Sequence, residues 1–173
     1  MDETALLLDS TTIKVHQHAR GAYHEETGQS RGGLTTKVHA VTDGLGNPLC
    51  FLLSSGNRND ICVVQALLEP FALNGKRILA DKGYDSDKLV RRLEEQGGIE
   101  AIPSRITAKH LRKTDWHTYK EHNLVESLFL KLKNNRRFAT RYEKKALYFH
   151  AVVYLACILV GYFDDFKTDS RNK

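Results

Sequence analysis

The order of the apolar runs is the feature that most restricts how this chain of 173 residues can fold. Residues 5–9 form a short apolar run that ends in an acid, and β-branched residues follow at 11–15, so a buried strand is expected here. Alternation at residues 34–42 and 49–54, around a Gly- and Pro-containing turn, predicts a hairpin. Further along, the patterns predict a helix at 61–73, a strand at 76–80, a helix ending at 95, a strand at 100–103, and helices at 119–145 and 146–163. This alternation of strands and helices is typical of a single α/β domain, here spanning residues 1–173.

Residues 119–145 predict a helix with one face that mixes acid and base. At 100° per residue, Tyr119, His122 and Lys133 fall within about 40° of Glu126. Four apolar residues form the adjoining stripe that would pack on a core: Val125, Leu128, Phe129 and Leu132. A carboxylate beside such a stripe is costly to bury alone. We therefore expect a cation or a metal ion to compensate Glu126.

The charge balance points to a polyanionic partner. The net charge is +5 and the sequence pI is about 9.1. Seven Lys or Arg residues lie between positions 131 and 145, against the single acid Glu143. A run of this kind is also compatible with a solvated helix face. Both interpretations stay open at the level of charge alone.

Compartment signals are consistent with a cytosolic protein. The three cysteines are odd in number and contain no C-x-x-C pair, so we interpret them as reduced thiols. The acidic N-terminus does not resemble a signal peptide. Residues 146–163 are mostly apolar but short for a membrane span, and they predict a buried C-terminal helix.

Three acids stand where the expected fold can bring them together. Asp9 closes the first apolar run. Asp81 follows a strand that breaks at Gly83, which places it at the carboxyl edge of a sheet, where open α/β folds have their sites. With Glu126 they form an all-oxygen set suited to Mg²⁺ or Mn²⁺. Such ions commonly act in pairs in phosphoryl displacement, which suggests a two-ion site with Asp9 as the shared carboxylate.

Each motif also has an interpretation that involves no catalytic role. Asp9 or Asp81 alone could be a turn or helix-capping acid, and Glu126 a surface acid. His16, His18 and His24 could hold a metal, but no further ligand at a zinc-like spacing follows, so solvated or phosphate-contacting histidines are favoured.

Four segments resemble the catalytic domain of the DDE transposases of bacterial insertion sequences, in the insertion-sequence-five-like group. They are LLLDST (6–11), GGLTTKVHAVTDGLGNPL (32–49), ADKGYDS (80–86) and YKEHNLVESLFLKLKNNRRFATRYEK (119–144). In such transposases the last segment follows Tyr, two residues, Arg, three residues, Glu, six residues and Lys. Tyr119, Glu126 and Lys133 match this pattern, whereas His122 stands at the Arg position. The difference matters because a guanidinium is always charged and bidentate, and an imidazole is neither.

The resemblance implies an RNase H-like fold, an α/β mixed sheet flanked by helices with a C-terminal helical region. It implies that Asp9, Asp81 and Glu126 are the catalytic, metal-binding triad. The cofactor would be Mg²⁺ or Mn²⁺, as two ions. The activity would be hydrolysis at transposon ends, followed by attack of the 3′-hydroxyl on target DNA.

The same resemblance gives expectations for DNA contacts. Lys133 would contact a phosphate near the cleavage site, and Tyr119 and His122 would position DNA or the triad glutamate. Charge alone makes four further residues plausible phosphate contacts: Lys82, Arg136, Arg137 and Arg141.

The resemblance also bears on partners. Asp9 lies eight residues from the start, which leaves no room upstream for the DNA-end-binding domain that such transposases usually carry. Since this group often encodes its enzyme in two overlapping frames, we interpret the chain as the downstream half, fused to or dependent on an upstream product. A homodimer on DNA is implied, in the bacterial cytoplasm and at the nucleoid when bound. The alternatives are a non-enzymatic DNA-binding remnant and a stand-alone RNase H-like nuclease.

Overall fold

The computed structural model describes residues 4–19, 25–105, 112 and 119–169, with side chains of the last helix described as far as Gly161. The strands are β1 (Ala5–Val15), β2 (Gly28–Ser30), β3 (Gly33–Asp43), β4 (Pro48–Ser55), β5 (Arg77–Ala80), β6 (Ile99–Ala101) and β7 (Thr140–Arg141). The α-helices are α1 (Val64–Leu68), α2 (Asp87–Glu95), α4 (Asn123–Lys133), α5 (Arg136–Ala139) and α6 (Ala146–Asp169). Short 3₁₀ helices are η1 (Gln17–Ala19), η2 (Asp60–Cys62), η3 (Lys82–Tyr84) and η4 (Lys120–His122).

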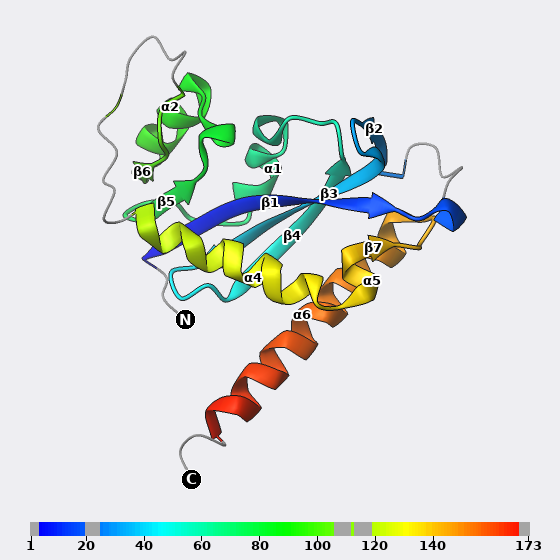
Figure 1. Cartoon of the computed structure of the whole chain (residues 1–173). Helices are drawn as coiled ribbons and strands as arrows, with labels where there is room; N and C mark the ends of the chain where they lie inside the picture. The colour runs from blue at the N-terminus through cyan, green and yellow to red at the C-terminus, as the bar shows by residue number, and fades with distance from the viewer. Residues whose placement is uncertain (1–3, 20–24, 106–111, 113–118, 170–173) are drawn as a thin grey trace.

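Strand β1 is the centre of a mixed sheet that joins all seven described strands (Figure 1). It pairs antiparallel with β3 and parallel with both β5 and β7. The β3–β4 hairpin extends one side of the sheet, and β6 continues the other side by pairing parallel with β5. The predicted α/β class and the hairpin are confirmed.

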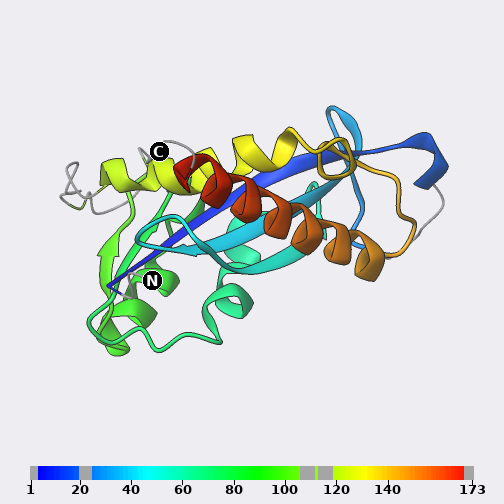
Figure 2. The same cartoon turned by 90° about the horizontal axis from the view of Figure 1, so that it is seen from below.

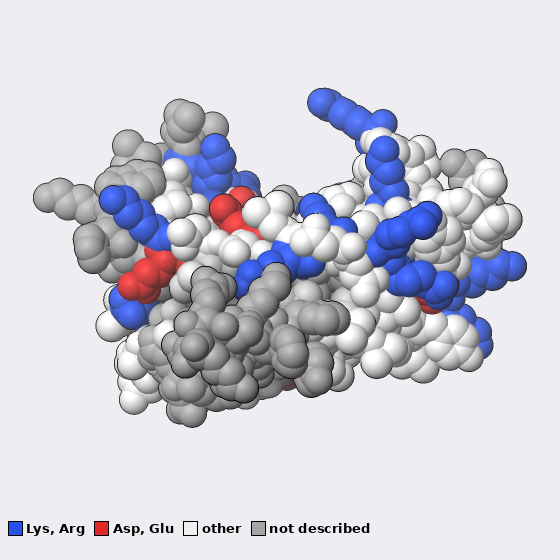
Figure 3. Space-filling model, turned by 60° about the horizontal axis from the view of Figure 1, so that its bottom comes forward, with Lys and Arg blue, Asp and Glu red and all other residues white. Residues whose placement is uncertain are grey.

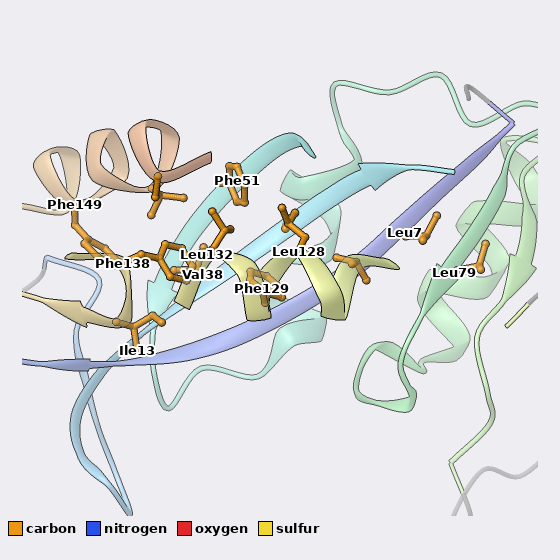
Figure 4. Packing of buried hydrophobic residues seen from close by; sticks show 14 of the residues in the cluster. Leu7, Ile13, Val38, Phe51, Leu79, Leu128, Phe129, Leu132, Phe138 and Phe149 are labelled. Atoms are coloured by element: carbon orange, nitrogen blue, oxygen red, sulfur yellow. The ribbon is translucent and has the colours of Figure 1, made fainter. Parts of the chain in front are cut away.

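The sheet is covered by helices on both faces because residues of β1 alternate between two cores. Leu7 and Ile13 pack with α4, α5 and α6 in a cluster that includes Phe129 and Phe138 (Figure 4). Leu6 and Leu8, which point the other way, pack with α1 and α2. Figure 2 shows α4 and α6 lying on the same face of the sheet. This layered arrangement agrees with the predicted RNase H-like fold.

Several predicted boundaries were wrong. The helix expected at 61–73 is the 3₁₀ turn η2 followed by α1, which ends at Leu68 just before Glu69-Pro70. Asn59 caps it, its side chain accepting the Ile61 N–H. Between the first strand and the hairpin the structure adds η1 and the edge strand β2, where no strand or helix was predicted from the sequence. Most of residues 104–118 lie outside the described part of the chain.

The helix expected at 119–145 is also interrupted. It begins as η4, continues as α4 to Lys133, and stops at Asn134 and Asn135. The Asn135 side chain accepts the Arg137 N–H and starts the short helix α5. Lys133 therefore does not lie on one continuous helix with Arg136, Arg137 and Arg141.

Helix α6 differs most from its expected environment. It was predicted to be buried, yet only one face is covered, through Phe149, Val153 and Ala156. The opposite face exposes large apolar side chains, among them Leu155 and Ile158. Within the part of the chain that the structure describes, no helix has the length and apolarity that crossing a bilayer requires.

Candidate active site

The register of two parallel strands places Asp9 beside Asp81. Leu8 of β1 pairs with Ala80 of β5, and the two aspartates are the next residue on each chain. Adjacent strands run about 4.8 Å apart. Asp81 leaves the strand to cap η3, and its Oδ1 accepts the Gly83 N–H at 2.7 Å. The tight approach at Gly83 leaves no space for a Cβ, which would lie 2.7 Å from the same carboxylate oxygen.

Glu126 reaches this region from the helix that covers the sheet. Two residues of α4, Val125 and Phe129, are buried in the core that also contains Leu7 of β1. Since residues alternate along a strand, Asp9 points to the same face as Leu7 and therefore toward α4. The Glu126 side chain is 61% exposed, so it stands at the rim and can turn toward either solvent or Asp9.

The surroundings of Asp9, including the charges of Asp81 and Glu126, change its titration. The pKa of Asp9 is raised from 3.8 to about 6, first by burial and further by the negative charges of Asp81 and Glu126; the Ser10 N–H and His122 act in the opposite direction. The pKa of the Tyr119 phenol is also raised, by burial and then by the same three carboxylates. Asp81 at the end of β5 and Glu126 on α4 are therefore near enough for their charges to act on Asp9 and Tyr119.

This acid set fits a divalent cation chemically. All donors are carboxylate oxygens, and a cation among them would offset the burial that chiefly raises the pKa of Asp9, together with the smaller repulsion from Asp81 and Glu126. Among the described side chains, however, no three His, Cys, Asp or Glu residues are arranged closely enough to hold an ion as they stand. Binding would require the exposed Glu126 side chain to turn inward. Of the histidines considered for zinc, His24 lies outside the described residues, and His16 stacks on Tyr142.

His122 holds the helix to the strand at this site, and of the two expected roles, positioning DNA or positioning the glutamate, its contacts favour the second. The imidazole is buried, and its Nε2 lies 2.9 Å from the Leu8 carbonyl oxygen. A carbonyl only accepts, so Nε2 carries the proton. Nδ1 lies 3.6 Å from Glu126 Oε1, and the ring stacks on Tyr119 with centroids 5.4 Å apart. His122 thus links the backbone beside Asp9 to the glutamate.

A second polar cluster, centred on Asp60, lies behind Asp9 and was missed at the sequence level. Asp60 Oδ1 accepts from Lys37 Nζ at 2.8 Å and from Ser10 Oγ at 3.1 Å. Lys37 Nζ also donates to the Arg58 carbonyl at 2.9 Å. Ser10 follows Asp9, so its side chain points to the opposite face of β1. The charge of Asp60 is compensated, unlike that of Asp9.

His39 extends this cluster to the loop after Asp81. Its Nε2 lies 2.8 Å from Ser54 Oγ, and its Nδ1 lies 3.4 Å from the Tyr84 hydroxyl and 3.8 Å from Asp60 Oδ1. Burial is the main reason that the pKa of His39 falls to about 4, so the ring is neutral at neutral pH. Tyr84 closes η3, which begins after Asp81. The cluster therefore ties β1, β3 and the Asp81 loop together.

Two arginines fasten the same loop from outside. Arg105 donates from Nε to the Lys82 carbonyl at 2.8 Å and from Nη2 to the Gly83 carbonyl at 2.6 Å. Its backbone N–H and the Arg112 guanidinium both bond to Asp85. Although burial alone would raise it, these bonds hold the pKa of Asp85 below its ordinary value. The segment after β6 thereby fixes the loop that carries Asp81.

The predicted phosphate contacts divide into exposed and buried side chains. Lys82, Lys133 and Arg136 are exposed. Arg137 is exposed too and pairs with Glu143. Figure 3 shows Lys and Arg side chains gathered on one face of the molecule, with few acids between them. These four cations remain candidates for DNA contact.

Arg141 is not available for DNA, and that prediction is wrong. Its side chain is fully buried. The guanidinium donates to the carbonyls of Glu25, Glu143 and Lys144 at 2.8 to 3.0 Å and to Thr36 Oγ1 at 2.8 Å. It cross-links β7, β3 and the start of α6. Its role is structural.

Residues 1–160 match the family described as "Transposase DDE domain". The chain is 35% identical over 131 residues to a putative transposase for insertion sequence element IS6501 from Brucella ovis, covering 73% of this chain and 98% of that protein. It is 31% identical over 147 residues to a putative transposase for insertion sequence element IS402 from Burkholderia cepacia, covering 78% of this chain and 65% of that protein. Among solved structures, it resembles the piggyBac transposase synaptic complex with hairpin DNA, with a TM-score of 0.46 and 14% identity over 65% of this chain and 25% of that one.

Proposed function

Because the chain belongs to the family of transposase DDE domains, we propose that Asp9, Asp81 and Glu126 hold the divalent cations with which it cleaves DNA at transposon ends and joins the ends to target DNA. Transposases of this family generally use divalent metal ions and act on DNA. The ions we propose are two Mg²⁺ or Mn²⁺, matched to oxygen ligands. When bound, they would supply charge neutralisation and activation of the attacking oxygen.

The observation that carries the proposal is the parallel register of β1 and β5 next to α4. It brings Asp9 and Asp81 to adjacent positions. The raised pKa of Asp9 supports the presence of Glu126 in the same electrostatic neighbourhood. A buried carboxylate with like charges beside it is typical of functional sites.

The chain's own residues divide the remaining work. His122 and Tyr119 orient Glu126 through the contact to β1 and the ring stack. The exposed cations Lys82, Lys133 and Arg136 lie on the elements that carry or flank the acids and are suited to hold the DNA backbone. Arg137 can join them if it exchanges Glu143 for a phosphate.

The partners of the site are proposals of the same kind. The chain spans 65% of the length of the Burkholderia cepacia relative, although it spans 98% of the Brucella ovis one. We propose that an upstream-frame domain supplies recognition of specific ends. The active form would be a homodimer on DNA, in the bacterial cytoplasm at the nucleoid.

A nicking assay with Mn²⁺ tests this proposal. Supercoiled DNA is incubated with the wild type, with Asp81→Asn, and with Asp87→Asn, which changes an exposed acid on α2. We expect nicking by the wild type and Asp87→Asn and none by Asp81→Asn. Equal nicking by all three would reject the triad. Equal absence, with DNA binding retained, would favour the DNA-binding remnant. Cleavage of DNA without joining of precut transposon ends to target DNA would favour the nuclease.

A further inference from the structure

The exposed face of α6 is an uncharged apolar surface. Residues 146–162 contain no Asp, Glu, Lys or Arg, although the whole chain carries a net charge of +5. The side chains on this face are 42% to 72% exposed: Leu147, Tyr148, Tyr154, Leu155, Ile158 and Leu159. In Figure 1 the C-terminal half of α6 extends past the edge of the sheet. A helix that is apolar on all sides is normally covered on all sides.

We propose that this face pairs with the same face of a second copy of the chain, with the two α6 helices antiparallel. Residues 146–162 carry no charge. Lys145, whose Nζ lies 5.9 Å from the Tyr148 ring centroid, stands at the N-terminal end of the helix, so in an antiparallel pair the two copies of this lysine lie at opposite ends and do not repel each other. Large side chains of this size bury on the order of 150–200 Å² each. Since these six are 42% to 72% exposed, they still offer roughly 600 Å² per copy for burial. That approaches the ~800 Å² per partner of a standard stable interface.

The order of large and small residues favours a twofold antiparallel arrangement. With the twofold axis between Tyr154 and Leu155 and nearer to Tyr154, position 151 of one helix faces position 158 of the other and position 147 faces position 161, each to within about half a residue. Both pairs set a large residue against a small one, Ile158 against Ala151 and Leu147 against Gly161. A Cβ built at Gly161 meets no atom within 4 Å, so space is available there. In a parallel pair in register, large residues would face large ones and small ones would face small ones.

This inference assigns the interface of the proposed homodimer to α6, and it does not depend on the proposed metal binding. Its test therefore uses the full chain without DNA or metal. Sedimentation measures the mass of the wild type, of Ile158→Lys, and of Leu130→Lys as the matched control. Leu130 is 69% exposed on α4 and Ile158 is 67% exposed on α6. We expect a dimer for the wild type and the control, and a monomer for Ile158→Lys.

A charge-pair rescue tests the direction of the helices. Ala151→Glu alone should give a monomer, while Ala151→Glu combined with Ile158→Lys should restore the dimer. Within one helix these positions lie seven residues apart and do not touch, so the rescue must act between copies. In a parallel pair the double variant would bring like charges together and stay monomeric, which would overturn the antiparallel arrangement.

A cross-link keeps the inference testable if a lysine variant fails to fold. In a Cys62→Ser background, which removes an exposed thiol, Leu155→Cys should form a disulfide-linked dimer on mild oxidation, and Leu130→Cys should not. A wild-type chain that sediments as a monomer at its highest attainable concentration would overturn the proposal. So would flotation of the monomer with neutral lipid vesicles, which would assign the face to a lipid surface.

Discussion

Replacing Asp9 by Asn should stabilise the metal-free protein at neutral pH, although it removes a member of the proposed triad. Burial, with the charges of Asp81 and Glu126, raises the pKa of Asp9 from 3.8 to about 6. Each pKa unit corresponds to about 1.36 kcal/mol, so ionising Asp9 in the folded chain costs about 3 kcal/mol relative to the unfolded chain. Asn keeps an oxygen for the Ser10 N–H, which lies 2.7 Å from Asp9 Oδ1, but carries no charge.

The direction of the Asp9 pKa shift determines the pH range in which the stability of the wild type changes. The folded pKa lies above the unfolded one, so between about pH 4 and pH 6 the folded chain keeps a proton that the unfolded chain has released. Wild-type stability is therefore lost as pH rises through this window, by about 1.4 kcal/mol per pH unit. Above about pH 6 the advantage of Asp9→Asn should level off near 3 kcal/mol. Urea unfolding in EDTA at several pH values between about 5 and 8 measures it.

Asp43→Asn is the matched control for this substitution. The buried Asp43 carboxylate accepts hydrogen bonds from the Leu45 and Asn47 N–H groups at 2.9 Å and from Asn47 Nδ2 at 3.0 Å, so its neutralisation should destabilise the chain. An Asp9→Asn chain that is less stable than the wild type above pH 6, or whose advantage does not change with pH, would refute the reasoning. Saturating Mn²⁺ should stabilise only the wild type, by about 2.7 kcal/mol at 100 times its Kd.

Four further predictions follow from individual contacts. Mn²⁺ affinity, measured by calorimetry, should fall about tenfold per pH unit below about pH 6, because Asp9 must lose its proton to bind; an unchanged affinity would exclude Asp9 as a ligand. Asp60→Asn leaves Lys37 without its carboxylate partner, so the free energy of unfolding in urea should fall by about 2 kcal/mol. The same substitution should weaken Mn²⁺ binding. An unchanged free energy of unfolding would contradict the pairing. Arg141→Lys should lower the free energy of unfolding by about 3 kcal/mol or more, because several buried acceptors lose their donor. The salt dependence of DNA binding should stay unchanged. Arg136→Ala should leave stability unchanged and lower the slope of log affinity against log salt by about 1, as measured by fluorescence anisotropy.

The strands could be predicted from sequence because their signals are local. Apolar alternation and the Gly- and Pro-containing turn located β1, β3, β4 and β5 within two residues of their observed bounds, apart from the C-terminal extension of β1 that its β-branched residues had also suggested. The short edge strand β2 was missed because it depends on pairing with β3, not on its own composition. Helical periodicity alone likewise missed the break in the helix at Asn135, where a side-chain cap starts α5.

The site could be predicted only as far as its acids. Asp9, Asp81 and Glu126 stand out because each ends a strand or interrupts an apolar stripe. Asp60 directly precedes the helix predicted at 61–73, where an acid commonly caps a helix, and nothing local distinguishes it from such a residue. Its partner Ser10 lies 50 positions away, and the pairing exists only after the sheet forms. Arg141 was misassigned for the converse reason, because a basic run gives no sign of which cation the fold will bury.

Two adjacent residues of β1, Asp9 and Ser10, point to opposite faces of the strand and meet different electrostatic surroundings. Asp9 faces α4, where burial, and to a smaller extent the neighbouring acids, make its charge costly. Ser10 faces the other side, where it bonds to Asp60, whose charge Lys37 neutralises at 2.8 Å. The hydrogen bonds behind the sheet hold β1, and with it Asp9, in its buried position, so the strand does not move to lower the cost of that charge. The remaining ways to relieve it are protonation or the arrival of a cation, which is the condition that a metal-dependent site requires.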